Sequence, residues 1–547
     1  MDKGRSVAAV VAAAAFVAGT ACLVAAEESI HHPTAADEPA VGNPQDYEVL
    51  RKLLGLASPE PEQPPVAMPV VSQPAPAFAG PAAAVQNLQE RSATAPAVRK
   101  AVVRIQPPKP APHREPPAAP AAVAAAPARA LQPEPEPVRL AAAAPAATPA
   151  DDLPATGTVL RASDIERYQS LFGPSVQWAM LRGATIRVGP HKPIPMEDAR
   201  AAATQKYHDQ VELTSDRRDM RNYVAGLPFP LVDDKDRDAG IKMIFNQQAR
   251  LVVDDMDARK MGCEIGSLSK HRGFELERTF QIEHWRRLYY LGRMYHAPVP
   301  TMPSQDGIRY RELQYPLIEP FDLKGGGWDF IRYSDIGRLD DGWIYYPITR
   351  RVRRLSTAQR SQGIFGQDMD LDSYTGYAGN PAWMQWRVVG HKTMLAPMHS
   401  DHVPVNWQAP PADFEADEPW EPREVYVLEG RSLLPEYAFA RRVIYLDRES
   451  WLVTYSEIYD DRGKLWKALH QTWGFGSKVR EDAGGRTFEE FYLPGYSMID
   501  MQIDHVTRCE LPLRTAVGDK GWYYNYGDAE GTTEKAFDIA GFLGETH

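Results

Sequence analysis

Hydrophobic and polar residues alternate along much of the chain after residue 274, in runs that Gly, Asp, Pro or Asn residues separate. A period of two is typical of antiparallel strands. No regular alternation of helix with strand is visible, which argues against a nucleotide-binding α/β fold. The pattern predicts one large, strongly curved antiparallel sheet or open barrel. The runs lie at residues 274–295, 342–355, 383–395, 423–431, 441–447, 451–460, 464–475 and 486–511.

Helix signals come before these strands. Residues 163–166 offer a cap for a first helix, and a second helix is expected to start near Pro195. A third is expected from about Ile241. The fold class predicted is therefore mainly β with helices (α+β), with the sheet wrapped around helices.

The stretch RRVIYLDRESWLVTYSEIYDDRGKLWK, residues 441–467, carries two tryptophans and three tyrosines. A period of two places Trp451, Val453 and Tyr455 on one face, and Tyr445 on the same face as Val443. We expect the Trp451 face to point to the concave side of the sheet. These rings are either plain core or the wall of a hydrophobic ligand cavity, because both would bury them equally well.

A second aromatic stretch, GWIYYPITRRVRRL at residues 342–355, repeats this pattern. Trp343 and Tyr345 share one face and are the other candidates for the cavity wall. The arginines follow where the strand approaches solvent. Arg351 and Arg353 either ring the mouth of the cavity and meet an anionic head group, or protect an edge strand from aggregation.

The N-terminal third has a different composition. Residues 1–26 have a basic start, an apolar run and small residues before Glu27, which predicts a secretory signal, with an uncleaved anchor as the alternative. Residues 27–57 form a polar tail in which 43–56 have the spacing of a short amphipathic helix. Residues 58–155 form a disordered Pro/Ala-rich linker, since 22 of the 48 prolines fall between residues 51 and 150. Residues 156–547 hold the β-rich domain.

The net charge of −11 makes the chain a poor candidate for binding nucleic acid, which needs a basic footprint, so nucleic acid is not an expected partner. An exported chain would carry Cys263 and Cys509 into an oxidising compartment, where they either pair or stay as buried thiols. Cys22 raises lipidation as a further alternative for the N-terminus.

Catalytic motifs are weak. The two histidines of HSDH, residues 399–402, lack other metal ligands at a known spacing. The glycines at 325–327 are not followed by the Lys-Ser/Thr of a phosphate loop, and no nucleophile elbow occurs. We therefore assign no catalytic residue, metal or cofactor, and we expect a protein that is not an enzyme.

The hairpin pair identified above resembles DUF1329, a bacterial family of exported proteins. The residues that carry the resemblance run from Tyr445, Asp447 and Trp451 to the YDDRGKL segment at 459–465. The likeness extends in family order over residues 157–515, although Asp236-Arg237 stands where the family usually has Asp-Pro. The family is similar in turn to lipoprotein carriers of the LolA/LolB type, whose open curved sheet wraps a helical plug and encloses a hydrophobic cavity.

This resemblance implies a role with a lipid or other hydrophobic small molecule. Family members often occur beside RND-type (MMPL-like) exporters, which implies such an exporter or another envelope protein as partner. The expected function is binding or transfer of this ligand in the periplasm, with association at the outer membrane. The alternative is a non-enzymatic envelope scaffold tethered by the Pro-rich linker.

Overall fold

The computed structural model describes residues 153–537, except 304–306, 337, 356–359, 435–436, 476–479, 482–486, 489–490, 517, 520 and 528–530. The chain divides into two units, one of which (Ser58–Ala142) lies wholly outside these residues. The fold below belongs to the other unit. The predicted signal, the tail with its 43–56 helix and nearly all of the 58–155 linker also lie outside the described residues.

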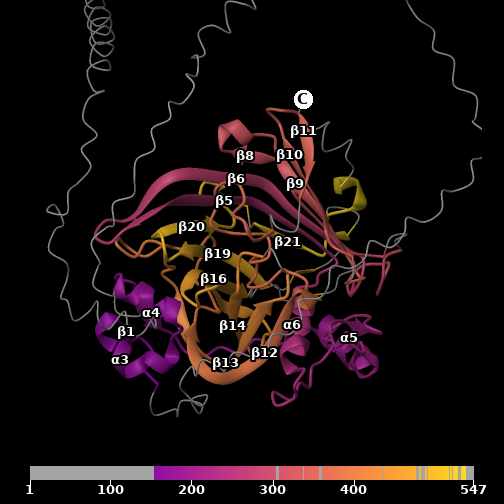
Figure 1. The fold of residues 1–547 in the computed structure, drawn as a ribbon, viewed down its shortest axis with the longest axis horizontal. Coiled ribbons are helices and arrows are strands. Elements are labelled where there is room, and N and C mark those ends of the chain that lie inside the picture. The colour runs from indigo at the N-terminus through magenta and orange to yellow at the C-terminus, as the bar shows by residue number, and fades with distance from the viewer. Residues whose placement is uncertain are drawn as a thin grey trace, which may run out of the picture. The chain divides into compact units, whose positions relative to one another are not determined.

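One open sheet dominates the described part, where it contains 17 strands. Its main strands lie side by side in the order β11, β10, β9, β7, β6, β5, β20, β19, β16, β15, β14, β13 and β12, and every neighbouring pair is antiparallel. Figure 1 shows this succession from β6 at one side to β12 at the other. Among the described residues β11 and β12 each pair with one neighbour, so the predicted sheet is present but does not close into a barrel.

The bounds of the main strands are β5 Asp255–Ser269, β6 Gly273–Tyr289, β7 Ile308–Gln314, β9 Gly327–Tyr333, β10 Asp341–Tyr346, β11 Arg351–Arg354, β12 Met384–Ala396, β13 Pro419–Ser432, β14 Arg441–Asp447, β15 Val453–Tyr459, β16 Leu465–Phe475, β19 Phe491–Asp500 and β20 His505–Glu510. Four short strands complete the sheet: β1 Val159–Leu160, β2 Ile186–Val188, β8 Leu317–Glu319 and β21 Trp522–Tyr524. Two separate pairs are β3 Glu212–Leu213 with β4 Met220–Arg221, and β17 Arg480–Glu481 with β18 Thr487–Phe488.

The described helices are α3 Ile165–Tyr168, α4 Pro174–Leu181, α5 Asp198–Tyr207 and α6 Ala239–Arg250. Three of them, α3, α5 and α6, begin close to the predicted positions. Helix α4 was not predicted, although Pro174 at its first turn is a common helix start. In Figure 1 α3 and α4 lie on one side of the sheet and α6 lies on the other. None of the helices in this part of the chain has the length and apolar composition needed to cross a bilayer.

The central strands are buried on both faces, since nearly every residue of β14, β15, β16 and β19 is shielded from solvent. Helix α6 and an irregular segment cover one face. We call residues 360–383 the interior segment; it has no α-helix or strand, yet most of it is buried. The other face is covered by α4 and by residues 397–418, where Phe414 packs 5.9 Å from Trp178 and accepts a hydrogen bond from Ser497 Oγ.

Charged and polar side chains tie the interior segment to the sheet. Arg442 donates to Ser373 Oγ at 2.9 Å, and Lys467 Nζ donates to the carbonyl of Asp368 at 2.8 Å. The Asp368 carboxylate also bonds His505, and this hydrogen bond raises the pKa of the imidazole. The prediction of a sheet wrapped around helices is therefore only partly right: α6 is one filling element, and an irregular polar segment is the other.

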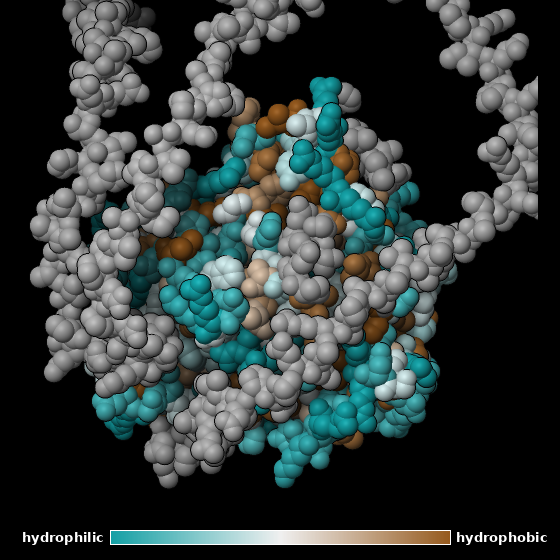
Figure 2. Space-filling view, viewed as in Figure 1, coloured by the Kyte–Doolittle hydropathy of each residue, from teal (hydrophilic) through white to brown (hydrophobic). Residues whose placement is uncertain are grey.

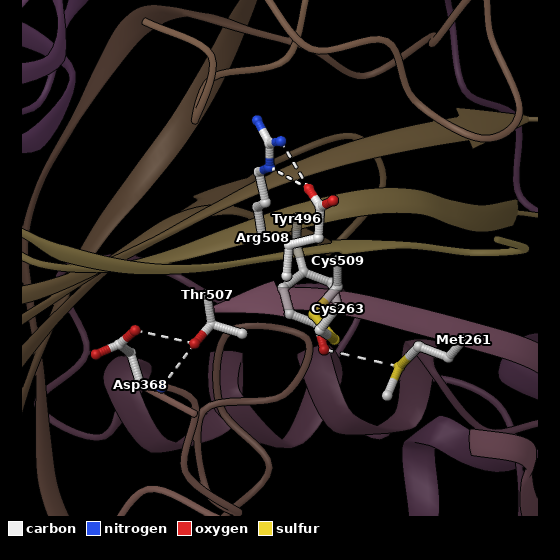
Figure 3. Close-up of a disulfide and its surroundings, with 8 residues drawn as sticks. Met261, Cys263, Asp368, Tyr496, Thr507, Arg508 and Cys509 are labelled. Carbon is white, nitrogen blue, oxygen red and sulfur yellow. Dashed lines mark hydrogen bonds and ion pairs between the residues drawn. A yellow bond between two sulfur atoms is a disulfide. The ribbon is translucent and has the colours of Figure 1, made fainter. Parts of the chain in front are cut away.

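A disulfide links the two middle strands β5 and β20. Cys263 and Cys509 are direct cross-strand partners and are bonded to each other, 246 residues apart in sequence. Figure 3 shows the bond beneath the ring of Tyr496, whose hydroxyl points to the sulfur of Met261. This bond joins the first of the main strands in chain order, β5, to the last, β20.

Candidate functional site

Two of the predicted cavity residues, Tyr445 and Tyr455, are direct partners on β14 and β15. Their rings lie 6.1 Å apart, and Trp420 stacks on Tyr455 at 5.7 Å. The Tyr445 hydroxyl donates to Glu457, and burial raises the pKa of both phenols. In this structure the two tyrosines are core residues on the face covered by α4 and residues 397–418.

The prediction that Trp451 and Val453 share a face with Tyr455 is wrong. Tyr445 pairs with Tyr455 but Leu446 pairs with Val453, so a β-bulge at this point reverses the alternation. Trp451 precedes the strand, has a φ of +59°, and stacks 6.0 Å from Tyr426. Trp451 and Val453 belong to the core cluster around α6, on the opposite face from Tyr455.

Trp343 and Tyr345 lie half-buried on β10, far along the sheet order from the other four residues. The alternate residues of β10 point to the interior: Ile344 packs against the main core, and the ring of Tyr346 lies 6.4 Å from Phe365. The six predicted residues are thus distributed over three places, and the suggestion that any of them contacts a ligand stays a prediction.

A different set of rings gathers where the interior segment meets this end of the sheet. We call Phe280 of β6, Trp328 of β9, Tyr346 of β10 and Phe365 of the interior segment the aromatic site. Phe365 lies at its centre, with its ring 6.1 Å from Phe280 and 5.3 Å from Trp328. Phe280 and Trp328 stack on each other at 6.1 Å. The three sheet residues therefore form a wall that Phe365 covers.

Phe365 is held in an unusual way. Its φ is +52°, a left-handed conformation that costs a bulky residue about 1–3 kcal/mol. It is only half-buried, whereas Phe280 and Trp328 are fully buried. Phe365 is therefore a strained and partly exposed ring that lies on two fully buried rings, Phe280 and Trp328.

Trp328 adds a polar feature to the wall. Its indole N–H is buried and, among the described residues, finds no hydrogen-bond acceptor. A buried donor without an acceptor costs about 1–3 kcal/mol. A ligand that brings an oxygen atom to this indole would recover that free energy, so the site suits an apolar molecule with a carbonyl or similar acceptor.

Charged residues lie beside the aromatic site. Arg278 lies against Gly366, next to Phe365, and reaches Asp322 at 3.5 Å. The guanidinium of Arg353 lies 5.6 Å from the centre of the Tyr346 ring. Both Arg351 and Arg353 are exposed on β11, directly opposite Tyr346 and Ile344. Their predicted role as charge at a cavity mouth stays a proposal.

Charged side chains also surround a small cavity in the interior. Its volume is about 20 Å³, and its lining includes Arg287, Glu312, Arg332, Asp340 and Arg360. Burial would raise the pKa of Asp340, but the charges of Arg332 and Arg360 outweigh it and lower this pKa. A second cavity near His470 measures about 10 Å³. Each has room for about one water molecule, so neither would hold an acyl chain as it stands.

The histidines of HSDH are engaged with carboxylates. His399 Nδ1 bonds Glu421, and His402 Nδ1 bonds Glu418 at 3.0 Å. Within the described residues no group of three or more His, Cys, Asp or Glu side chains is arranged to hold a metal ion.

Sequence reasoning missed Phe365 because GIFGQDMD (residues 363–370) has neither helical nor strand periodicity. The one available signal was a large ring between two glycines in an otherwise polar stretch. Phe280 and Trp328 were less visible still, because strand alternation does not distinguish a ligand-facing ring from a core ring.

Comparisons with known proteins identify the family. The model of the DUF1329 family, described as a protein of unknown function, matches residues 159–524. That span is more than half of the chain, and the chain belongs to this family. No curated protein matches it.

Three solved structures are similar at low identity. A candidate outer membrane lipoprotein-sorting protein domain from Vibrio parahaemolyticus is 14% identical, with a TM-score of 0.36 over 56% of this chain and 99% of that one. A DUF1329 family protein from Desulfovibrio piger is also 14% identical, with a TM-score of 0.36 over 56% and 98%. A LolA superfamily protein from Nitrosomonas europaea is 12% identical, with a TM-score of 0.27 over 48% and 86%.

Proposed function

We propose that this protein binds a lipid or another hydrophobic molecule in the periplasm and transfers it. The observation that carries the proposal is the position of Phe365, a strained and partly exposed ring on the buried wall of Phe280 and Trp328. The ligand would displace Phe365 and take its place on this wall.

The exchange is energetically reasonable. Burying an apolar group the size of a phenyl ring contributes about 1.5–3 kcal/mol. An acyl chain of similar size on the wall would therefore offset the burial free energy that is lost when the Phe365 ring leaves. Relaxation of the left-handed Phe365 backbone would add about 1–3 kcal/mol to the free energy of ligand binding. A ligand oxygen that accepts a hydrogen bond from the Trp328 N–H would add about as much. The ligand that fits has an apolar chain and an acceptor oxygen, as fatty acids and esters do.

Ligand binding should require movement of the interior segment. Because the two cavities named above are water-sized, an acyl chain requires movement of the interior segment near Phe365. Binding would therefore be coupled to a conformational change, and the affinity would depend on how often Phe365 leaves the wall.

The setting is part of the proposal. A disulfide between Cys263 and Cys509 suits an oxidising compartment, as the predicted secretory signal does. Partnership with an RND/MMPL-type exporter rests on the family resemblance alone. The role is non-enzymatic, since transfer of a hydrophobic molecule needs no bond to break.

Native mass spectrometry and a fluorescence titration test this function. Protein purified without detergent is expected to carry a bound lipid mass, and to bind cis-parinaric acid with saturation at one site. Protein that is free of lipid mass and shows no saturable binding of this probe would contradict the proposal.

The filled interior favours a second candidate, a structural scaffold of the envelope. In this case the ionic links of the interior segment to Arg442, Lys467 and His505 serve rigidity alone. Deletion of residues 43–155 separates the two functions. Lost localisation with probe binding retained favours the scaffold, whereas unchanged localisation argues against it.

A further inference from the structure

Three apolar side chains are exposed at the end of the sheet that carries the aromatic site. Phe321 is 84% exposed, Ile348 is 73% exposed and Val352 is 47% exposed. Phe321 begins a 3₁₀ turn (Phe321–Leu323) after β8, and Ile348 lies in the turn between β10 and β11. The two turns adjoin, because a Cβ on Gly326 would lie 2.9 Å from the Leu323 carbonyl oxygen and 3.1 Å from Pro347 Cδ.

The same hairpin carries four exposed arginines: Arg350, Arg351, Arg353 and Arg354. Arg354 forms an ion pair with Asp341, and Arg353 lies over Tyr346. Arg350 and Arg351 have no side-chain partner among the described residues. Such a concentration of positive charge is notable in a chain whose net charge is −11. Figure 2 shows hydrophobic and hydrophilic atoms side by side at the end where Figure 1 places β10 and β11.

Protection of an edge strand explains the arginines of this hairpin but not the exposed apolar side chains beside them. β11 is an edge strand, and arginines on such a strand discourage pairing with other chains. Edge protection gives no reason to expose Phe321 and Ile348, since solvent-exposed apolar side chains promote association. Apolar tips ringed by cations are instead the composition of surfaces that lie in the headgroup region of a membrane.

We propose that the tip formed by Phe321, Ile348 and the arginines of residues 350–354 docks on an anionic lipid bilayer. Phe321 and Ile348 enter the headgroup region, and Arg350 and Arg351 pair with lipid phosphates. The aromatic site adjoins this tip, since Arg278 touches Gly366 on one side and Asp322, next to Phe321, on the other. Docking would thus bring the site to the membrane, but it does not require the proposed cargo.

Vesicle flotation of the full chain tests the docking. The vesicles contain phosphatidylcholine with or without 30% phosphatidylglycerol, at about 0.15 M salt, and no cargo is added. Wild-type protein is expected to bind the anionic vesicles more tightly than the neutral ones. Arg350→Gln with Arg351→Gln is expected to weaken that binding by about 30-fold, since each surface arginine contributes about fivefold. Phe321→Ser with Ile348→Ser is expected to weaken it by about tenfold.

Matched variants control for general charge and hydrophobicity. Arg167→Gln with Arg462→Gln removes two exposed arginines elsewhere, and Leu231→Ser with Ile503→Ser removes side chains that are 88% and 68% exposed. All variants keep the N-terminal apolar run, so any contribution of this run to vesicle binding is the same in each of them. Circular dichroism verifies their folding. The proposal is overturned if wild type prefers neither vesicle, or if either tip variant binds as its control does. Probe titration in the absence of vesicles keeps this outcome separate from the proposed function.

Discussion

The ring of Phe365 lies 5.3 Å from the indole of Trp328, centroid to centroid, although the Phe365 backbone is in the left-handed region at φ +52°. A bulky residue adopts that conformation only where its surroundings stabilise it. Here the stabilisation comes from contacts of the ring with the aromatic wall, and these contacts offset the cost of the left-handed backbone. A ligand that occupies the wall would release the strain.

Removal of the Phe365 ring should therefore favour the ligand. In Phe365→Ala the wall is open without displacement, and we expect cis-parinaric acid to bind about tenfold more tightly than to wild type. Phe365→Gly should be about 1 kcal/mol more stable than Phe365→Ala, because glycine accepts a positive φ. Fluorescence titration and urea unfolding measure the two effects.

Phe229→Ala is the control for this substitution. Phe229 is also half-buried, and it packs 6.3 Å from Phe245 of α6, away from the aromatic site. Its loss should leave the affinity for the probe unchanged. Equal affinities of Phe365→Ala, Phe229→Ala and wild type would count against displacement of Phe365.

Because the indole N–H of Trp328 has no acceptor among the described residues, Trp328→Phe and Trp473→Phe should differ in their effect on stability. Trp328 and Trp473 are both fully buried, but Trp473 Nε1 donates to the Val453 carbonyl at 2.8 Å. Trp473→Phe loses that hydrogen bond, whereas Trp328→Phe removes a donor that has no acceptor. We expect Trp328→Phe to be less destabilising by about 1–2 kcal/mol in urea unfolding. The reverse order would show that the Trp328 N–H has a partner.

The contact between the interior segment and β15 predicts that Gly376 tolerates no side chain. Its φ is +97°, and a Cβ there would lie 2.4 Å from Cβ of Val453. Gly376→Ala should cost about 2–4 kcal/mol from overpacking and backbone strain together. Gly463→Ala should cost only about 1 kcal/mol, because Gly463 has a similar φ of +77° with nothing within 4 Å. Similar costs at both positions, measured by urea unfolding, would contradict the packing described.

The carboxyl of Asp329 predicts a dependence of stability on pH. Burial raises its pKa to about 6, although Arg311 at 3.2 Å opposes the shift. Between about pH 4 and pH 6 the folded state holds a proton here that the unfolded state has released, so stability decreases as pH rises through this window. Asp329→Asn lacks this titration. Its unfolding free energy relative to wild type should increase by about 2 kcal/mol from pH 4 to pH 7. A constant difference across this range would refute the assignment.

The bond between Cys263 and Cys509 predicts a stability that depends on redox state. Because it closes a long loop, its loss should lower the free energy of unfolding by about 2–5 kcal/mol. Thermal unfolding with and without dithiothreitol should differ for wild type. The double variant Cys263→Ala with Cys509→Ala should unfold at one temperature in both conditions. An unchanged wild-type transition in dithiothreitol, after a thiol assay has shown that both cysteines are reduced, would contradict this role.

The sequence was informative where the chain is periodic. The alternating runs became strands of the sheet, because inward side chains on such strands have a hydrophobic core to bury them. The assignment of faces failed at Val453 and Tyr455, since the bulge between them depends on pairing with β14, which a single strand does not reveal.

The interior segment lay beyond sequence reasoning for another reason. Asp368 and Ser373 read as loop polarity, yet the structure buries both against Lys467 and Arg442, which are about 70–100 residues distant in sequence. Partners so far apart leave no local pattern. The aromatic site depends on this segment, so it could be found only in three dimensions.

Photo-crosslinking with a diazirine-bearing fatty acid tests the central claim most directly. After irradiation of the detergent-free protein, peptide mass spectrometry locates the attached label. If the ligand replaces Phe365, labels are expected on the strands of the aromatic wall, around Phe280, Trp328 and Tyr346, and unlabelled oleate should compete with them. No competable label, or competable label confined to other parts of the chain, would contradict the claim.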